Sequence, residues 1–255
     1  MSTIQRRVIL FFLLSFPLTW WGFGLAWLFP SQTWANTNFA LGPLIAAPIA
    51  IWLTEGRDGL MRWLRRLARF RAPVWVYTAA FFVPLGIPAL TTILTLATGI
   101  APGPVPTFGP DELVFYAVLV AIAGPIPEEL TFRGYGQHEL QTGMAPLTAS
   151  LWIGVGVVIW HLPLLISGQI PWLIVITIMA VSVVYAWIYC GGGSVWPVVI
   201  VHFTHNYFGT AFFQEIFAPA DRMTFVAILT IFYIVWVGLI VWRLGPSLGL
   251  KQQPA

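Results

Sequence analysis

The sequence predicts an all-α membrane protein that crosses the bilayer about eight times. Of its 255 residues, 58% are hydrophobic and only 8% are charged, whereas soluble domains carry roughly 25% charged residues. Two long stretches, residues 72–110 and 140–214, contain no Asp, Glu, Lys or Arg. A bilayer core of roughly 30 Å takes about 20 helical residues per crossing. The apolar residues suffice for seven or eight crossings, so we expect a single transmembrane domain over residues 1–255.

Eight hydrophobic stretches give the expected helices in chain order. They lie near residues 8–29, 38–54, 73–99, 111–134, 145–167, 171–190, 195–217 and 223–243. The first has no small-residue cleavage site, so we expect it to be retained rather than removed as a signal peptide. A run of three glycines, Gly191 to Gly193, predicts a tight turn between the sixth and seventh stretches.

The basic residues predict the orientation of the chain. Arg6 and Arg7 precede the first stretch, and Arg243 and Lys251 follow the last. Six more lie between the second and third stretches: Arg57, Arg62, Arg65, Arg66, Arg69 and Arg71. Because basic residues in short loops stay in the cytoplasm, both termini are expected there, in a multi-pass protein of a prokaryotic plasma membrane. The six arginines alternate with apolar residues, a pattern typical of a helix in the headgroup layer, and we interpret it as a topological anchor.

Composition also limits the partners and cofactors. The net charge of +3 is small, so membrane lipids rather than nucleic acid are the expected partners. A single cysteine, Cys190, allows no internal disulfide and no cysteine-rich metal site.

Polar groups within the hydrophobic stretches are the candidate functional residues, because charges inside a membrane helix are costly and are generally functional. Three stretches contain them: Glu128, Glu129 and Arg133 in the fourth, His161 in the fifth, and His202 and Asn206 in the seventh. Glu129 and Arg133 are four residues apart, which favours an ion pair. Glu128 points about 100° away from Glu129 and stays free to act as a general base. His202 and Asn206 share one face and can direct donors to one point.

Two prolines predict a break within the fourth stretch. Pro125 and Pro127 remove backbone donors, so we expect the helix to break just before Glu128 and a new helix to begin there. Acidic residues in a first helical turn are favoured by the helix dipole. The carbonyl groups freed near Ala121 and Ala123 need water, which predicts a wet cavity, and we expect it to open to the cytoplasm.

Three motifs resemble those of a known family. They are Glu-Glu-x-x-x-Arg (Glu128, Glu129, Arg133), Phe-x-x-x-His ending at His161, and His-x-x-x-Asn (His202, Asn206). In the second motif Val157 replaces the phenylalanine. Over residues of about 111–214 the chain resembles the CAAX prenyl protease type II and bacteriocin-processing (CPBP, or ABI) proteins, which are intramembrane glutamic endopeptidases.

The resemblance implies an endopeptidase that cleaves a peptide bond near the membrane. It implies that Glu128 and His161 activate a water molecule and that His202 and Asn206 stabilise the oxyanion. The Glu129–Arg133 pair is expected to support the structure around the catalytic residues. By family analogy the substrate is a hydrophobic or prenylated C-terminal segment, and no cofactor is implied.

Other interpretations remain open. The polar cluster could be an ion-pair brace in a non-catalytic immunity or binding protein. A zinc metalloprotease would need a dispersed ligand set of Glu128, His161, His202 and His205, because His138-Glu139-Leu140-Gln141-Thr142 lacks the second histidine of a zinc motif. A serine protease is disfavoured because Ser194 is badly placed relative to His202. We expect His138 and His205 to be structural or interfacial. Straight helices would also place His161 and His202 at different depths.

Overall fold

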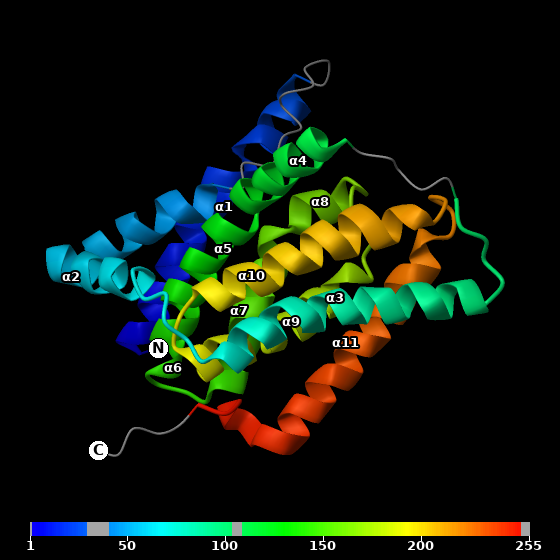
Figure 1. Ribbon diagram of the computed structural model, residues 1–255. Helices are drawn as coiled ribbons and strands as arrows, with labels where there is room; N and C mark the ends of the chain where they lie inside the picture. The colour runs from blue at the N-terminus through cyan, green and yellow to red at the C-terminus, as the bar shows by residue number, and fades with distance from the viewer. Residues whose placement is uncertain (1, 30–40, 104–108, 251–255) are drawn as a thin grey trace.

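The computed structural model describes residues 2–29, 41–103 and 109–250, and the regular secondary structure in these ranges is entirely helical. The helices form a bundle in which α9 and α10 lie among the others (Figure 1). This confirms the predicted all-α fold.

Each expected hydrophobic stretch contains helix. The elements are α1 (Thr3–Leu28), α2 (Gly42–Leu67), α3 (Val74–Ala97), α4 (Pro110–Ala123), α5 (Pro125–Thr131), the π-helical segment η2 (Phe132–Gln137), α6 (His138–Gln141), α7 (Pro146–Trp160), α8 (Leu162–Ile166), α9 (Ile174–Gly192), α10 (Trp196–Thr204), the π-helical segment η3 (His205–Phe213), the 3₁₀ segment η4 (Gln214–Ile216), α11 (Arg222–Leu244) and the 3₁₀ segment η5 (Gly245–Ser247).

Five helical segments among the described residues are long and apolar enough to cross a membrane. They are Thr3–Leu28, Val74–Ala97, Pro110–Gln141, Ile174–Gly192 and Arg222–Ser247. The protein is therefore a polytopic membrane protein, and the count of eight crossings stays a prediction. The other three expected crossings differ from these five. The helix of the second, α2, continues into charged residues, the apolar helix of the fifth, α7, has 15 residues, and the seventh changes from α-helix (α10) to π-helix (η3).

The core surrounds α9. Of its most apolar window, 67% is buried inside the protein, and it packs against α7, α11 and α10. A helix that is hydrophobic on all sides requires such a position. At its end, Gly193 adopts a left-handed conformation (φ +63°) that caps the helix, as the glycine run predicts.

One end of the bundle gathers the arginines. Gly56 (φ +64°) kinks α2, so its arginine-rich half runs in a new direction. Arg7 Nη1 lies 3.5 Å from Glu55 and 3.4 Å from Glu139, and Arg66 lies 3.8 Å from Glu139. The start of α1, the second half of α2 and α6 thus meet at this end, which we call the arginine-rich end.

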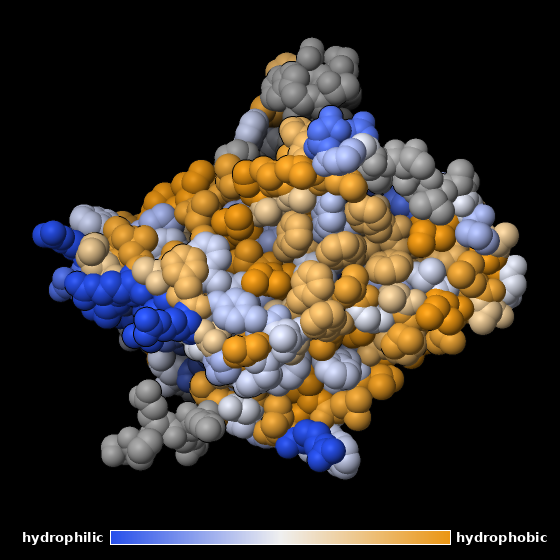
Figure 2. All heavy atoms as spheres, viewed as in Figure 1, coloured by the Kyte–Doolittle hydropathy of each residue, from blue (hydrophilic) through white to orange (hydrophobic). Residues whose placement is uncertain are grey.

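The surface follows the same division. A hydrophilic patch covers the arginine-rich part of α2, at the left of Figure 2, and hydrophobic side chains cover much of the rest of the visible face (Figure 2). The other end of the bundle, which we call the opposite end, carries α8, η4 and the starts of α4 and α11 (Figure 1). There Arg222 forms an ion pair with Glu215 at 2.5 Å.

Candidate functional site

The candidate site is built on a helix break at Gly124. Helix α4 ends at Ala123, and α5 begins at Pro125. The break therefore lies earlier than the position just before Glu128 that the sequence predicts, because Pro125 rather than Pro127 occupies the first helical position, where a missing N–H costs nothing. Glu128 still lies in the first turn of the new helix, and its N–H donates to the Gly124 carbonyl at 3.0 Å.

A buried ionic cluster lies beside this turn. Arg133 Nη1 is 3.3 Å from Glu129 Oε2, which is the ion pair that the spacing predicts. His202 Nδ1 is 2.7 Å from Glu129 Oε1. Arg133 Nη2 also donates to Ser182 Oγ at 3.1 Å, and its guanidinium lies 5.1 Å from the centre of the Tyr185 ring. Because buried charges need both an opposite charge and hydrogen bonds, α9 completes this cluster.

The segment that carries Arg133 is a π-helix, which the sequence pattern does not predict. All six residues of η2 are buried. Its glycines allow close packing, since a Cβ on Gly134 would lie 2.9 Å from Leu67 Cδ2, and one on Gly136 would lie 2.8 Å from Ile153 Cδ1. π-Helical turns occur frequently at functional sites. Gly134 and Gly136, which follow Arg133, were the sequence signal that could have indicated this close packing.

Next to the ionic cluster is a pocket of about 700 Å³. It is lined by Tyr116, Val120, Ala123, Gly124, Glu128, Trp160, His161, Leu164, Asn206, Thr210, Ala211, Gln214 and Glu215. Three of the four predicted catalytic residues, Glu128, His161 and Asn206, thus line one pocket although they lie on three separate parts of the chain.

Gly124 lies between two of these side chains. A Cβ at this position would be 3.5 Å from Glu128 Oε1 and 3.6 Å from Asn206 Nδ2. The carboxylate and the amide therefore both approach the backbone at the helix break. The missing side chain of Gly124 leaves space between them.

The ring of His161 is oriented by the backbone. Its Nδ1 lies 2.8 Å from the Val157 carbonyl oxygen. A carbonyl oxygen only accepts hydrogen bonds, so Nδ1 carries the proton and the neutral ring keeps Nε2 as an acceptor. A histidine in this tautomer can receive a proton from water.

The fourth predicted residue, His202, lies behind the pocket. It is buried, it is not among the residues that line the pocket, and its Nδ1 is bonded to Glu129. Nitrogen and oxygen atoms of Glu128, Glu129 and His202 nevertheless lie within 4.8 Å of one another. His202 thus connects the ionic cluster to the Glu128 carboxylate.

The two remaining histidines bond to tyrosines outside the pocket. His205 Nδ1 lies 2.7 Å from the Tyr233 hydroxyl, and His138 Nδ1 lies 3.1 Å from the Tyr189 hydroxyl. These contacts fit the structural roles expected for both.

Metal ligation fits these residues poorly. Among the described residues, the group whose ligand atoms are close enough to share a cation is Glu128, Glu129 and His202. Arg133 already pairs with Glu129 there, and its positive charge opposes a second cation. The dispersed set considered from the sequence also needs His205, which bonds Tyr233 instead.

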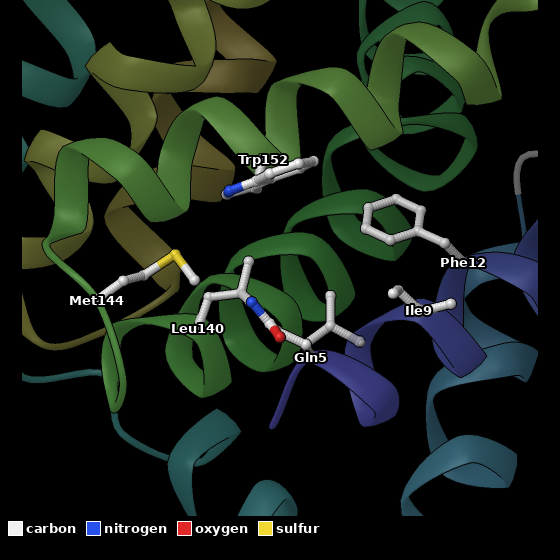
Figure 3. A pocket seen from close by; sticks show the side chains of 7 residues that line it. Gln5, Ile9, Phe12, Leu140, Met144 and Trp152 are labelled. Atoms are coloured by element: carbon white, nitrogen blue, oxygen red, sulfur yellow. The ribbon is translucent and has the colours of Figure 1, made fainter. Parts of the chain in front are cut away.

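A second, smaller pocket offers no comparable chemistry. It has a volume of about 260 Å³ and lies between α1, α6 and α7 (Figure 3). Six of its seven lining residues are apolar and the seventh is Gln5. Trp152 and Ile9 are exposed at its edge, so its walls are suited to contact with a lipid chain.

The fold and the site together define a polytopic α-helical membrane protein with ionisable groups buried at a helix break. Residues 110–208 match the family model described as Type II CAAX prenyl endopeptidase Rce1-like. The match contains all six predicted site residues and supports the CPBP family predicted from the motifs. No curated protein matches the chain.

Proposed function

We propose that the protein is an intramembrane endopeptidase that hydrolyses a peptide bond in the 700 Å³ pocket. The observation that carries the proposal is the convergence of Glu128, His161 and Asn206 on this pocket within an apolar bundle. The family match supports peptidase chemistry of the CAAX type. An ion-pair brace alone would not require a carboxylate and an imidazole to face the same open volume.

In the proposed reaction, Glu128 and His161 hold and deprotonate a water molecule. The water oxygen attacks the carbonyl carbon of the peptide bond, and the proton passes to the Glu128 carboxylate, assisted by Nε2 of His161. The Asn206 amide donates to the oxyanion of the tetrahedral intermediate. When the C–N bond breaks, the protonated Glu128 returns the proton to the leaving amine.

The neighbouring ionic cluster gives this chemistry a fixed frame. His202 is held by Glu129, which is in turn held by Arg133 and, through it, by Ser182. His202 is therefore held close to Glu128, where it supports the charge that develops in the reaction. Glu129 and Arg133 are positioning residues in this proposal.

The proposed substrate is a hydrophobic peptide segment, with a prenylated C-terminal segment as the first to test. Val120, Ala123, Trp160 and Leu164 supply apolar walls beside the reacting groups. Apolar lining with a few polar groups is typical of ligand pockets.

The decisive experiment compares Glu128→Gln with wild type. Detergent-purified protein is incubated with a fluorogenic prenylated peptide, and cleavage is followed by fluorescence and mass spectrometry. Glu128→Gln keeps the shape and removes the base, so we expect the rate to fall at least about 100-fold, the low end for a general base. Glu112→Gln, an exposed carboxylate at the start of α4, is the matched control and should retain the wild-type rate.

Two outcomes would contradict the proposal. Undiminished cleavage by Glu128→Gln would remove Glu128 from the mechanism. Loss of activity on chelation with recovery on addition of Zn²⁺ would favour the zinc alternative, whose strongest support is the closeness of Glu128, Glu129 and His202.

A further inference from the structure

We propose that the pocket opens to the extracytoplasmic side of the membrane and receives its peptide from that side. The inference rests on the proposed peptidase function for its chemistry and on the placement of the pocket for its direction. We expected from the sequence a cavity that opens to the cytoplasm, but the lining residues lead to the opposite end of the bundle.

The direction of the pocket follows from the helices that line it. Helix α10 begins near the arginine-rich end, where Trp196 Nε1 donates to the Leu67 carbonyl at 2.7 Å. Helix α7 begins beside η2, where Gln137 Nε2 donates to the Pro146 carbonyl at 3.1 Å. The residues that line the pocket follow the ends of these helices, away from the arginine-rich end. They are His161 and Leu164, which follow α7, and residues within 206–215, which follow α10. Helix α4 begins at the opposite end and contributes Tyr116, Val120 and Ala123 on the way inward. The pocket therefore extends from Glu128 to Glu215, which lies next to the turn that precedes α11 (Figure 1).

The other direction is filled by protein. Beyond Glu128, the chain continues through η2, in which Phe132, Tyr135 and Gln137 are each 0% exposed. Past η2, Glu139 is engaged by Arg7 and Arg66. Within the described residues, packed side chains and ion pairs thus separate Glu128 from the arginine-rich end.

The distribution of charge assigns the two ends to the two sides of the membrane. The sequence has 11 arginines. Eight of them lie at the start of α1 or in and just after the second half of α2: Arg6, Arg7, Arg57, Arg62, Arg65, Arg66, Arg69 and Arg71. Arg243 lies in the last turn of α11, and the segment that follows it, η5, contacts α7. The segments at the opposite end contain a single one, Arg222, together with Asp111, Glu112, Glu215 and Asp221. Since arginine-rich loops are retained in the cytoplasm, the mouth beside Glu215 faces away from it.

This placement restricts the substrate. A cytoplasmic C-terminal segment would have to pass the buried η2 segment to reach Glu128. A hydrophobic segment that emerges from the membrane on the extracytoplasmic side, or an exported peptide that partitions into the outer leaflet, reaches the pocket directly. The substrate class that the structure favours is therefore an extracytoplasmic, membrane-associated peptide.

Cysteine labelling tests the direction without requiring activity. Because Cys190 is the only cysteine, a Cys190→Ser background allows single cysteines at Thr210, in the pocket, and at Arg65, at the arginine-rich end. With a membrane-impermeant maleimide applied to spheroplasts, we expect Thr210→Cys to be labelled before permeabilisation and Arg65→Cys only after it. Thr210→Cys that is not labelled before permeabilisation would overturn the inference.

A cleavage assay separates failure of this inference from failure of the proposed function. A fluorogenic hydrophobic peptide with a charged, impermeant tail is added to right-side-out and to inverted vesicles. We expect cleavage by the right-side-out vesicles, and cleavage by inverted vesicles alone would overturn the inference. Absence of cleavage in both preparations and in detergent would contradict the peptidase proposal, while the labelling pattern would still decide the direction.

Discussion

The two halves of the helical run Pro110–Gln141 differ sharply in burial. In α4 none of the 14 residues is buried. In α5 and η2, which follow after Gly124, nearly every residue is buried. Figure 1 shows α4 at the upper edge of the bundle and α5 deeper within it.

This difference shows how one helical run serves two purposes, contact with lipid in its outer half and packing within the protein in its inner half. Phe115 of α4 is 70% exposed and is suited to lipid, whereas Phe132 of η2 is 0% exposed and packs against aromatic rings of α1. The inner half anchors the ionic cluster, and the outer half forms one wall of the pocket. Glu128, the proposed catalytic carboxylate, lies just after Gly124, the junction between the two halves. There the buried inner half meets the pocket.

The largest effect on stability is expected from the inner half. Arg133→Met removes the arginine partner of the Glu129 carboxylate, which is 0% exposed, and leaves His202 as its remaining contact. Removing one partner of a buried pair costs about 3–5 kcal/mol. The free energy of unfolding in detergent, measured by denaturant titration, should fall by this amount.

Two variants test whether burial is the cause. Arg62→Met removes an exposed arginine from Glu55, which keeps Arg7 as a second partner, and should change the free energy of unfolding by less than about 1 kcal/mol. Adding Glu129→Gln to Arg133→Met removes the unpaired charge and should recover part of the loss. Equal losses for Arg133→Met and Arg62→Met would show that the inner half is not the rigid support described above.

A matched pair of phenylalanines compares the two halves directly. Phe132→Ala leaves a cavity in packed protein and should cost about 3 kcal/mol, at the low end for such changes, because the surrounding membrane is already apolar. Phe115→Ala removes a lipid-facing ring and should change stability by less than about 0.5 kcal/mol. Thermal unfolding in the same detergent measures both, and similar losses would contradict the comparison.

The sequence was sufficient for the parts of the fold and site that follow from local periodicity. Hydrophobic length gave the helices, and four-residue spacing gave the Glu129–Arg133 pair, which the structure contains. The prolines indicated a helix break but not its position at Gly124. The grouping of Glu128, His161 and Asn206 in one pocket came from motif resemblance, because spacing within single helices carries no information about distances between helices.

Other features depended on tertiary packing and could not be predicted. The bond between His202 and Glu129 joins residues 73 positions apart, and Ser182 and Tyr185 reach Arg133 from α9. The π-helical geometry of η2 depends on the close approach of α2 and α7 to its glycines. The direction in which the pocket opens could be inferred only from the arrangement of the helices together with the distribution of charged residues.

The smallest expected effect concerns the attachment of α4. The Tyr207 hydroxyl donates to the Leu113 carbonyl at 3.0 Å and links η3 to the outer half of the run. Tyr207→Phe removes this bond at a cost of about 1 kcal/mol, and the effect should be confined to α4 because its other contacts with protein are few. Hydrogen–deuterium exchange should therefore become faster in Pro110–Ala123 and stay unchanged in Ile174–Gly192. Faster exchange in both segments would mean that α4 is coupled to the core as tightly as α9, and the division between an outer wall and a rigid inner support would fail.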